Sequence, residues 1–378
     1  MKIAIVSVME GYPWGGSEEL WYQMAKEALK QGHQLFISYK KWEDTPPKLK
    51  ELEQKGANIY FRENTVRYPS LIKRALYKLL DKKAQIKHED SFKWLDNIQP
   101  NIILVNEGGF LNAVLFPTLT DRLMKGAWNY FTLTHSNREY GAVGAEKRKL
   151  GRELYSKAKS ALFVSEGNKK MAEIFLCNKL PNTKIVRNPV NLNALDYIPY
   201  PEDKTMRLAI VGRLLCRQKG HDLLLRALAE LKNEYSFSLA IYGQGPDADY
   251  LKTLVKYLHL QDIVHFEGHV RNIEHIWSKN QLLILPSHFE GMPLVVVEAM
   301  LSGRPCLVTD VAGYKEWVND NSNGFICTSN KVIALTRCLR FAFDAQKTWK
   351  KMGLQARKDA LNISPKDPGR KLLKAIMS

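Results

Sequence analysis

Short apolar runs alternate with helical segments along almost the whole chain, and this alternation limits the possible folds more than any other feature. Residues 3–9 form an apolar run, and a glycine-rich turn follows them. The pattern then predicts a helix over residues 18–31, with Ser17 as its N-cap. A second apolar run, residues 34–39, follows the glycine that ends this helix. Apolar runs without a polar face suit strands that are covered on both sides, so the chain is predicted to be α/β with parallel sheets.

A polar stretch with three prolines, residues 188–204, interrupts the alternation once. Such a stretch is typical of a linker. We therefore predict two successive doubly wound, Rossmann-like domains. The predicted units are a first domain over 1–190, a linker over 191–204, a second domain over 205–360 and a helical tail over 361–378 that can cross back to the first domain. Further strands are predicted at residues 101–106, 128–134, 160–165, 206–212, 238–242, 263–266, 282–285, 305–308 and 324–327, and further helices at 220–233 and 249–259.

Composition narrows the class of protein. The 378 residues are enough for two domains, and a hydrophobic content of 45% is typical of a globular chain with a core. No apolar run approaches the ~18 residues that a membrane helix needs, and the first residues lack the pattern of a signal peptide. The five cysteines form no C-x-x-C pair, which argues against a disulfide framework or a zinc site and favours a cytoplasmic protein. The net charge of +17 favours an anionic partner: nucleic acid, anionic lipid or a phosphorylated substrate.

The segment 285–300, Leu-Pro-Ser-His-Phe-Glu-Gly-Met-Pro-Leu-Val-Val-Val-Glu-Ala-Met, carries the most specific pattern. A predicted strand ends at Leu285, and Pro293 suits the first turn of a following helix. The free amides and the dipole at such a helix start bind phosphate, and Gly291 would let a ligand approach the backbone. Glu290 precedes the helix, where its carboxylate can accept hydrogen bonds from sugar hydroxyls. Glu298 lies about one and a half turns along, where it can accept both hydroxyls of a ribose.

Glu290 and Glu298, with seven residues between them inside Phe-Glu-Gly-Met-Pro…Glu-Ala-Met, resemble the E-x7-E signature of family 4 of the retaining glycosyltransferases. That family has the GT-B architecture, in which two Rossmann-like domains face a cleft. The resemblance implies that the domain over 1–190 binds the acceptor and that the domain over 205–360 binds the nucleotide sugar. The resemblance implies transfer of a hexose-type sugar from a nucleotide diphosphate sugar, with a UDP-sugar favoured over a GDP-sugar. It also implies that Met292, Pro293 and Leu294 contribute to donor binding. Two glutamates eight residues apart would alone fit a solvated helix face, but the flanking glycine, proline and apolar strand favour the functional interpretation.

A second candidate site is the segment 210–222, which follows a predicted strand and enters a helix. It resembles the Gly-Arg…Lys-Gly pattern of the same family, with Arg213 and Lys219 in the phosphate-binding places. Two cations there would stabilise the negative charge that grows on the departing diphosphate. The pair is one residue further apart than in the commonest form of the pattern, so Arg217 remains an alternative to Lys219.

Two features of the first half resemble the same family. Gly15 and Gly16 follow the first strand, where the family has a Gly-Gly pair beside the transferred sugar, although a tight turn alone would also require glycine. His135 ends the predicted strand 128–134, at the edge where α/β proteins bind ligands, and resembles the family's active-site histidine. Glu107 follows another strand, and its role is open. Of the weaker matches in the second half, Gly243 and Val270 are the ones expected near the donor.

A basic segment, residues 71–87, has six Lys or Arg, one Asp and apolar residues at helical spacing. Its apolar face would pack on the first domain, or the segment would lie on an anionic membrane surface, and we favour packing. The protein is thus expected in the cytoplasm, with a peripheral position at the inner face of a membrane as an open alternative.

These patterns predict a metal-independent, retaining glycosyltransferase. The predicted catalytic residues are His135, Arg213, Lys219 and Glu290. The sequence has no D-x-D motif in a fitting loop, so we expect no metal and no cofactor besides the nucleotide sugar as co-substrate. The acceptor would be a hydroxyl on a saccharide, a glycolipid or a small molecule. A sugar-nucleotide epimerase or a phosphorylase on the same fold is the alternative among enzymes. A basic nucleic-acid-binding protein is the alternative of another class, although no basic face interleaved with aromatics is evident and no nucleic acid is expected as a partner.

Overall fold

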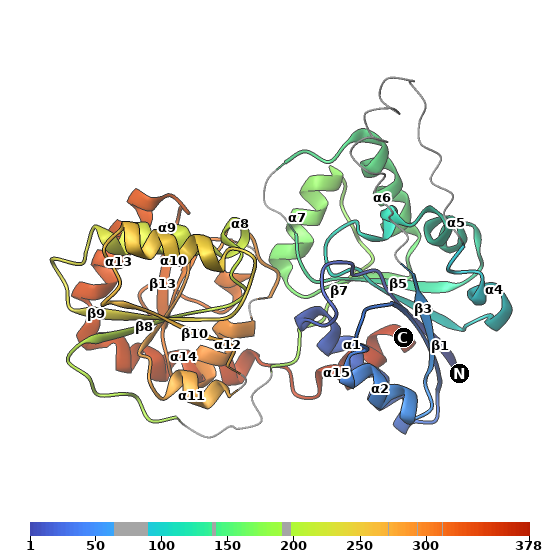
Figure 1. Cartoon of the computed structure of the whole chain (residues 1–378). Coiled ribbons are helices and arrows are strands. Elements are labelled where there is room, and N and C mark those ends of the chain that lie inside the picture. The colour runs from blue at the N-terminus through green and yellow to red at the C-terminus, as the bar shows by residue number, and fades with distance from the viewer. Residues whose placement is uncertain (64–89, 138–140, 191–197, 271, 293, 312) are drawn as a thin grey trace.

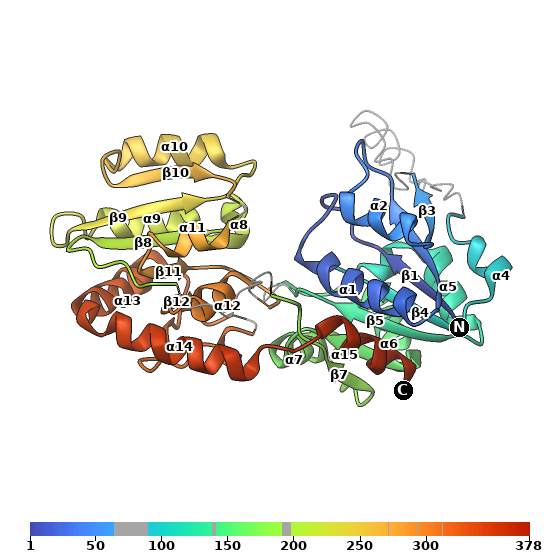
Figure 2. The ribbon, with the colours of Figure 1, turned by 90° about the horizontal axis from the view of Figure 1, so that it is seen from below.

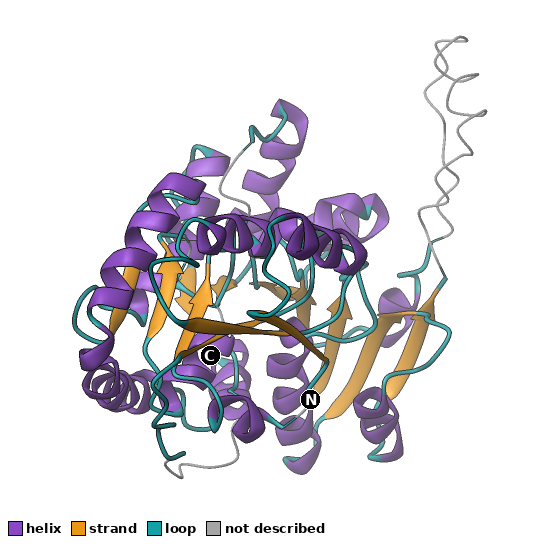
Figure 3. Cartoon of the chain, turned by 60° about the vertical axis from the view of Figure 1, so that its left-hand side comes forward, coloured by secondary structure: helices purple, strands orange, loops and turns teal. Residues whose placement is uncertain are grey.

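The computed structural model describes residues 1–63, 90–137, 141–190, 198–270, 272–292, 294–311 and 313–378. Two α/β domains lie side by side, and each has a parallel sheet between layers of helices (Figure 1). Figure 3 shows the same layers with the strands in orange and the helices in purple on both sides of them. The predicted α/β class with two Rossmann-like domains is confirmed. The basic segment 71–87, the linker residues 191–197 and Pro293 lie outside the described residues.

The first domain contains a seven-stranded parallel sheet in the order β3-β2-β1-β4-β5-β6-β7. Its strands are β1 (Lys2–Ser7), β2 (Gln34–Lys40), β3 (Asn58–Arg62), β4 (Ile102–Asn106), β5 (Asn129–Thr134), β6 (Ser160–Phe163) and β7 (Thr183–Ile185). Its helices are α1 (Gly16–Lys30), α2 (Pro47–Gln54), α4 (Trp94–Ile98), α5 (Pro117–Lys125), α6 (Ala145–Lys157) and α7 (Glu166–Leu176), with a short 3₁₀ turn at Ala113–Leu115.

Alternation along β1 explains why this sheet is covered on both faces. Ile3 and Ile5 belong to one apolar cluster, whereas Ala4 and Val6 belong to another. Successive side chains of a strand point to opposite faces, so both faces of β1 are apolar and both need helices to cover them.

The second domain contains a six-stranded parallel sheet in the order β10-β9-β8-β11-β12-β13, and one continuous apolar cluster surrounds it. Its strands are β8 (Met206–Val211), β9 (Phe237–Tyr242), β10 (Val264–Gly268), β11 (Leu282–Leu285), β12 (Cys306–Thr309) and β13 (Gly324–Cys327). Its helices are α8 (Cys216–Lys219), α9 (His221–Ala229), α10 (Ala248–Tyr257), α11 (Ile273–Trp277), α12 (Leu294–Leu301), α13 (Val332–Asp344) and α14 (Trp349–Ile363), with short 3₁₀ turns at Tyr314–Glu316 and Gln346–Thr348.

The chain ends against the first domain. Helix α14 packs in the second domain beside α12, and α15 (Pro368–Met377) then packs along α1 (Figure 2). Leu372, Leu373 and Ile376 of α15 belong to the same apolar cluster as Ile3 and Ile5 of β1. A side chain at Gly369 would overlap the backbone of Gln23, so this glycine permits the two helices to approach closely.

Three local predictions were wrong. Ser17 is not an N-cap, because the extended residue Gly15 is the N-cap, Ser17 lies inside the first turn, and its hydroxyl donates to Glu18 Oε2 at 2.6 Å. The helix expected over 220–233 is shorter, since α9 spans only His221–Ala229, and the short helix α8 before it, separated by the left-handed Gly220 (φ 68°), was not predicted. The edge strands β3 and β7 were not predicted. Within the described part of the chain, no helix has both the length and the apolar character needed to cross a membrane.

Candidate active site

A cavity of 780 Å³ lies between the two domains, at the ends of several strands. From the first domain it is lined by residues that follow β1, β4 and β5, including Tyr12, Gly108 and His135. From the second it is lined by residues that follow β8 and β11, including Arg213 and Glu290. Ligands of open parallel sheets bind at the carboxyl ends of the strands, so this cavity is the candidate active site.

An ion pair between Lys219 and Glu290 lines the cavity on the second domain's side. Lys219 Nζ lies 2.5 Å from Glu290 Oε1, and the Ser287 hydroxyl donates to the same oxygen at 3.0 Å. The two charged side chains are only 15% and 8% exposed, so they are held in place rather than solvated. Lys219 lines the cavity, whereas Arg217 is exposed and does not line it. Lys219 is therefore the better placed of the two cations.

Arg213 reaches the cavity from the turn after β8 and contacts the other domain. Its guanidinium carbon lies 5.3 Å from the ring centroid of Tyr12, a cation–π contact across the cavity. Arg213 and Lys219 thus bring two positive charges to the same cavity.

The start of α12 supplies the remaining donor-side groups. Met292, Leu294 and Glu298 all line the cavity. Burial raises the pKa of the Glu298 carboxyl to about 7, so it is close to its titration midpoint at neutral pH. A bound ligand that donates hydrogen bonds to this carboxyl would favour its charged form.

Gly291 lines the cavity, and besides the approach of a ligand the structure gives a second reason for a glycine at this position. A Cβ at this position would overlap the carbonyl oxygen of His135 in the first domain. Gly291 and Ser136 pair as an isolated antiparallel bridge, and Asn168 Nδ2 donates to the His135 carbonyl at 3.2 Å. The missing side chain therefore makes room for the backbone of the first domain, in addition to the ligand that was expected to approach Gly291.

A second contact between the domains lies nearby. Arg187 Nη1 is 2.9 Å from Glu316 Oε2, and the Gly167 amide donates to the other carboxylate oxygen at 3.1 Å. The Asn188 amide approaches Met292 Sδ at 3.2 Å. The backbone contact at Gly291 and this ion pair together hold the domains against each other beside the cavity.

His135 directly follows β5 and is neutral in this environment. Burial lowers the pKa of its imidazole to about 3, and its Nε2 lies 2.8 Å from Asn106 Oδ1. Gly16 also lines the cavity, and a Cβ there would lie 3.0 Å from Leu294 Cδ1. Gly15 is not a lining residue, because it packs under the Tyr12 ring, which would overlap a Cβ at this position.

Three candidate residues lie away from the cavity walls. Gly243 has φ 138°, and a Cβ there would overlap the carbonyl oxygen of Gly212, so it allows two strand ends to approach. Val270 packs against the core of the second domain. Glu107 points into the first domain, where it accepts hydrogen bonds from the Ala113 amide at 3.0 Å and from the hydroxyls of two residues, Thr134 and Tyr155.

Sequence reasoning missed several lining residues, and the two aromatic ones are the most informative. Tyr12 and Trp14 line the cavity from the loop after β1. Trp14 Nε1 donates to Glu19 Oε1 at 2.7 Å, which fixes the indole. The signal that could have identified them is an aromatic pair inside a glycine-rich loop at a strand end. Asn188, Gln218 and Gln244 also line the cavity.

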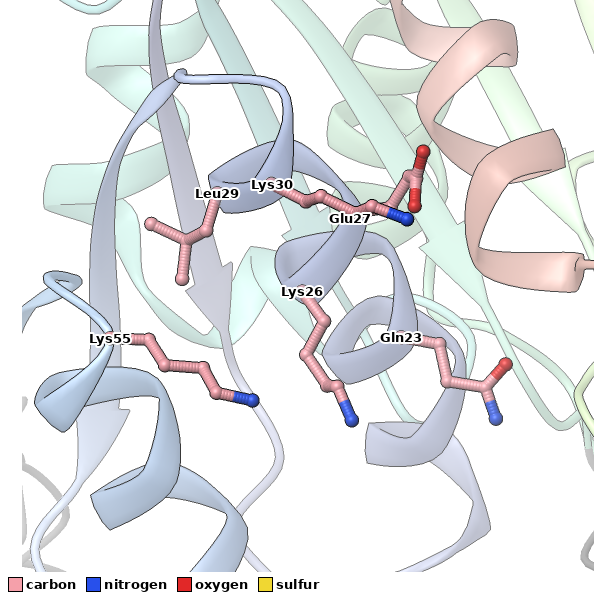
Figure 4. Close-up of a pocket in the computed structure, with 6 residues that line it drawn as sticks. All are labelled: Gln23, Lys26, Glu27, Leu29, Lys30 and Lys55. Carbon is pink, nitrogen blue, oxygen red and sulfur yellow. The ribbon is translucent and has the colours of Figure 1, made fainter.

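A second cavity, of 610 Å³, lies on the outer side of α1 and differs from the first in character (Figure 4). Lys26 and Lys30 of α1 and Lys55 at the end of α2 line it. Lys26 and Lys55 both pair with Glu51, at 3.5 and 2.6 Å. Since the first cavity is lined from both domains and holds most of the predicted residues, it remains the candidate active site.

Comparison with solved structures assigns the architecture. A glycosyltransferase from Rickettsia africae superposes with a TM-score of 0.73 and 18% identity, over 100% of this chain and 99% of that one. HepE from Anabaena, in complex with UDP and glucose, superposes with a TM-score of 0.72 and 18% identity, over 100% and 99%. The fold is GT-B.

Sequence comparison also finds similarity to glycosyltransferases, and a family model covers the second domain. Residues 199–359 match the family model of glycosyl transferases group 1. An uncharacterized glycosyltransferase from Haemophilus influenzae is 24% identical over 347 residues, which are 91% of each chain. N-acetyl-alpha-D-glucosaminyl L-malate synthase from Bacillus anthracis is 34% identical over 104 residues, 28% of this chain and 27% of that protein. The chain is thus similar to glycosyltransferases, and most specifically so in the domain that carries Arg213, Lys219, Glu290 and Glu298.

Proposed function

We propose that this protein is a retaining glycosyltransferase of family 4 that moves a hexose-type sugar from a UDP-sugar to a hydroxyl group of a saccharide or lipid-linked acceptor. One observation carries the proposal: two cations, two glutamates and a helix start of the second domain share one cavity with His135 of the first. The match of residues 199–359 to glycosyl transferases group 1 supports it. HepE, which has the same fold, is described with UDP and glucose, and this supports UDP as the nucleotide.

The donor would lie across the start of α12. Arg213 and Lys219 would bind the diphosphate together with the first amides of the helix, which point away from the helix and favour anions. Glu298 would accept the ribose hydroxyls, and Glu290 would accept hydroxyls of the transferred sugar. The aromatic rings of Tyr12 and Trp14 suit the apolar face of a sugar on the acceptor side.

The reaction would break the bond between the anomeric carbon and the diphosphate oxygen and form a bond from that carbon to the acceptor oxygen. The acceptor proton would pass to the leaving diphosphate on the same face of the sugar, which retains the configuration. Negative charge grows on the diphosphate as the bond breaks, so Arg213 and Lys219 would stabilise the transition state more than the ground state. The protein supplies both cations itself, and we propose that it needs no metal ion.

Product analysis tests the proposal. The protein is incubated with UDP-sugars and GDP-sugars, the thermal shift and donor hydrolysis are recorded, and saccharide and lipid-linked acceptors are added next. Transfer of label from a UDP-sugar to an acceptor supports the proposal. An isomerised nucleotide sugar would instead identify an epimerase, and a sugar 1-phosphate formed with inorganic phosphate would identify a phosphorylase. Glu290→Gln should abolish transfer while the circular dichroism spectrum is unchanged.

The excess positive charge raises a separate question about location. We propose that the +17 charge draws the protein to the anionic inner face of a membrane, where each basic residue near the surface contributes roughly 1 kcal/mol. Liposomes with anionic lipid should retain the protein at low salt. Equal recovery from neutral and anionic liposomes would refute this location.

A further inference from the structure

The ring of Tyr12 contacts a cation of the other domain across the cavity. Tyr12 lies in the loop after β1, Arg213 lies in the turn after β8, and both line the cavity. The guanidinium carbon of Arg213 is 5.3 Å from the centroid of the ring. This distance is within the ~6 Å over which the face of an aromatic ring attracts a cation. One contact thus joins a loop of the first domain to a positive charge of the second.

The two cations of the cavity differ in what holds them. Lys219 pairs with Glu290 at 2.5 Å, and both side chains are largely buried. Arg213 is exposed, and among the residues that the structure describes its side chain forms no ion pair and no hydrogen bond. A long arginine side chain without such partners keeps much of its rotamer freedom. Within the described chain, the contact with the Tyr12 ring is therefore the one directional interaction of this guanidinium.

The Tyr12 ring is itself held by Gly15. A Cβ at Gly15 would overlap Cε2 of the ring, so the ring packs directly on the backbone at the start of α1. Gly15 has φ −153°, an extended conformation that alanine also adopts, so the backbone does not require a glycine here. The missing side chain instead makes room for the ring. The Tyr12 hydroxyl forms no hydrogen bond within the described residues, so the contact with Arg213 depends on the ring face.

We propose that Tyr12 is a positioning residue: packed on Gly15, its ring places the Arg213 guanidinium where negative charge grows on the leaving diphosphate. The placement itself is a property of the unliganded protein, whereas its effect on the reaction rests on the proposed function. Tyr12 and Arg213 belong to different domains, so the cation takes this place only when the domains are closed. Closure then acts on the chemical step more than on binding of the nucleotide.

Nitrogen NMR of the whole unliganded protein, labelled with ¹⁵N in its arginines, tests the placement without any substrate. The Nε–H resonance of Arg213 is assigned by its loss in Arg213→Lys. An aromatic ring shields a proton over its face, so this proton should resonate at higher field in the wild type than in Tyr12→Leu. Tyr12→Phe keeps the ring face and should keep the shift. Gly15→Ala displaces the ring and should lose it. A resonance that is the same in the wild type, folded Tyr12→Leu and folded Gly15→Ala would overturn the proposal.

A matched glycine separates the packing of the ring from a general effect on the loop. Gly11 lies in the same loop, nothing is within 4 Å of a Cβ there, and its φ is not left-handed. Gly11→Ala should leave the Arg213 resonance and the rate unchanged. In a Tyr12→Ala background, Gly15→Ala should cost less than about 1.5-fold in rate, because the ring that the new methyl group would overlap is absent. An equal loss in both backgrounds would overturn the role of Gly15 in placing the ring.

Kinetics test the effect on the reaction. Hydrolysis of a UDP-sugar is measured without an acceptor, so that any contact between Tyr12 and the acceptor does not enter. Tyr12→Leu should lower kcat for hydrolysis about 3- to 10-fold, the range expected for one lost cation–π contact, and Tyr12→Phe should restore it. The dissociation constant of UDP should change less than about twofold, because Lys219 and Glu298 still hold the nucleotide.

A double-variant cycle shows whether the effect passes through Arg213. In an Arg213→Met background, Tyr12→Leu should cost less than about 1.5-fold in kcat, because the cation that the ring places is absent. Losses that multiply in the double variant would overturn the positioning role. If neither hydrolysis nor transfer is detected with any nucleotide sugar, the proposed function fails, and the Arg213 resonance still decides the placement independently.

Discussion

Replacing Gly291 by alanine tests whether the contact between the domains is part of the active site. The new Cβ would overlap the His135 carbonyl oxygen, so the two backbones must separate by about 1–2 Å to reach a normal contact. Glu290 and His135 would move apart by a similar distance. A misplacement of about 1 Å can cost about 100-fold in rate, so we expect kcat/KM for transfer to fall about 100-fold or more.

Separation would also strain the ion pair between Arg187 and Glu316 beside the contact. A hydrogen bond to a charged group contributes about 1.5–3 kcal/mol, so losing one of the two bonds to Glu316 would lower the population of the closed arrangement about tenfold or more. Small-angle scattering should show a larger radius of gyration. The dissociation constant of UDP should change less than about threefold, because Lys219 and Glu298 both belong to the second domain.

Gly144→Ala is the matched control, since nothing lies within 4 Å of a Cβ at that position and its φ is negative. It should leave the rate and the scattering profile within error of the wild type. A Gly291→Ala protein that transfers sugar within about twofold of the wild-type rate, with an unchanged scattering profile, would refute the idea that this backbone contact aligns the two halves of the site.

Three further predictions concern the cavity walls. Lys219→Met should weaken UDP binding at least about tenfold, measured by calorimetry, whereas Arg217→Met should change it less than about twofold; equal effects would contradict the placement of Lys219. Glu298 has a folded-state pKa of about 7, above the ~4.3 of an unfolded glutamate, so the folded state holds the extra proton and this group lowers stability as pH rises from about 4.5 to 7. In urea unfolding series across this pH range, the free energy of unfolding of Glu298→Gln should decline by about 1–3 kcal/mol less than that of the wild type. An unchanged pH dependence would contradict the burial of the carboxyl. Tyr12→Ala should raise KM for a saccharide acceptor several-fold with less effect on KM for the donor, and the reverse order would assign the ring to the donor.

Apolar strands of both sheets could be predicted well from the sequence, whereas β3 and β7, the edge strands of the first sheet, could not. Residues 282–285 and 324–327 were predicted to the residue, because an apolar run between polar flanks has few alternatives. β7 has only three residues, Thr-Lys-Ile, and pairs with one neighbour, so its sequence lacks a continuous apolar run. The break at Gly220 likewise depends on a left-handed turn that packs against the carbonyl of Pro286, a contact that the sequence does not contain.

Neighbouring residues at the end of β4 show why the site was only partly predictable. Asn106 ends β4 and Glu107 follows it; both are polar, and the sequence analysis singled out only Glu107. Side chains alternate along a strand, and the structure turns Asn106 toward His135 and Glu107 toward Thr134 and Tyr155. Which of the two side chains contacted His135 depended on how the strand sits in the sheet, which a single sequence does not determine.

The same loop both carries chemistry and joins the domains. Glu290 pairs with Lys219 on the second domain, and the next residue, Gly291, meets the backbone of His135 on the first. The His135 ring is in turn oriented by Asn106 within its own domain. The same placement of this loop therefore both closes the domains and aligns the reacting groups. Because the donor-side groups all belong to one domain, binding of the nucleotide should survive a loss of closure, while transfer, which needs both domains in register, should not.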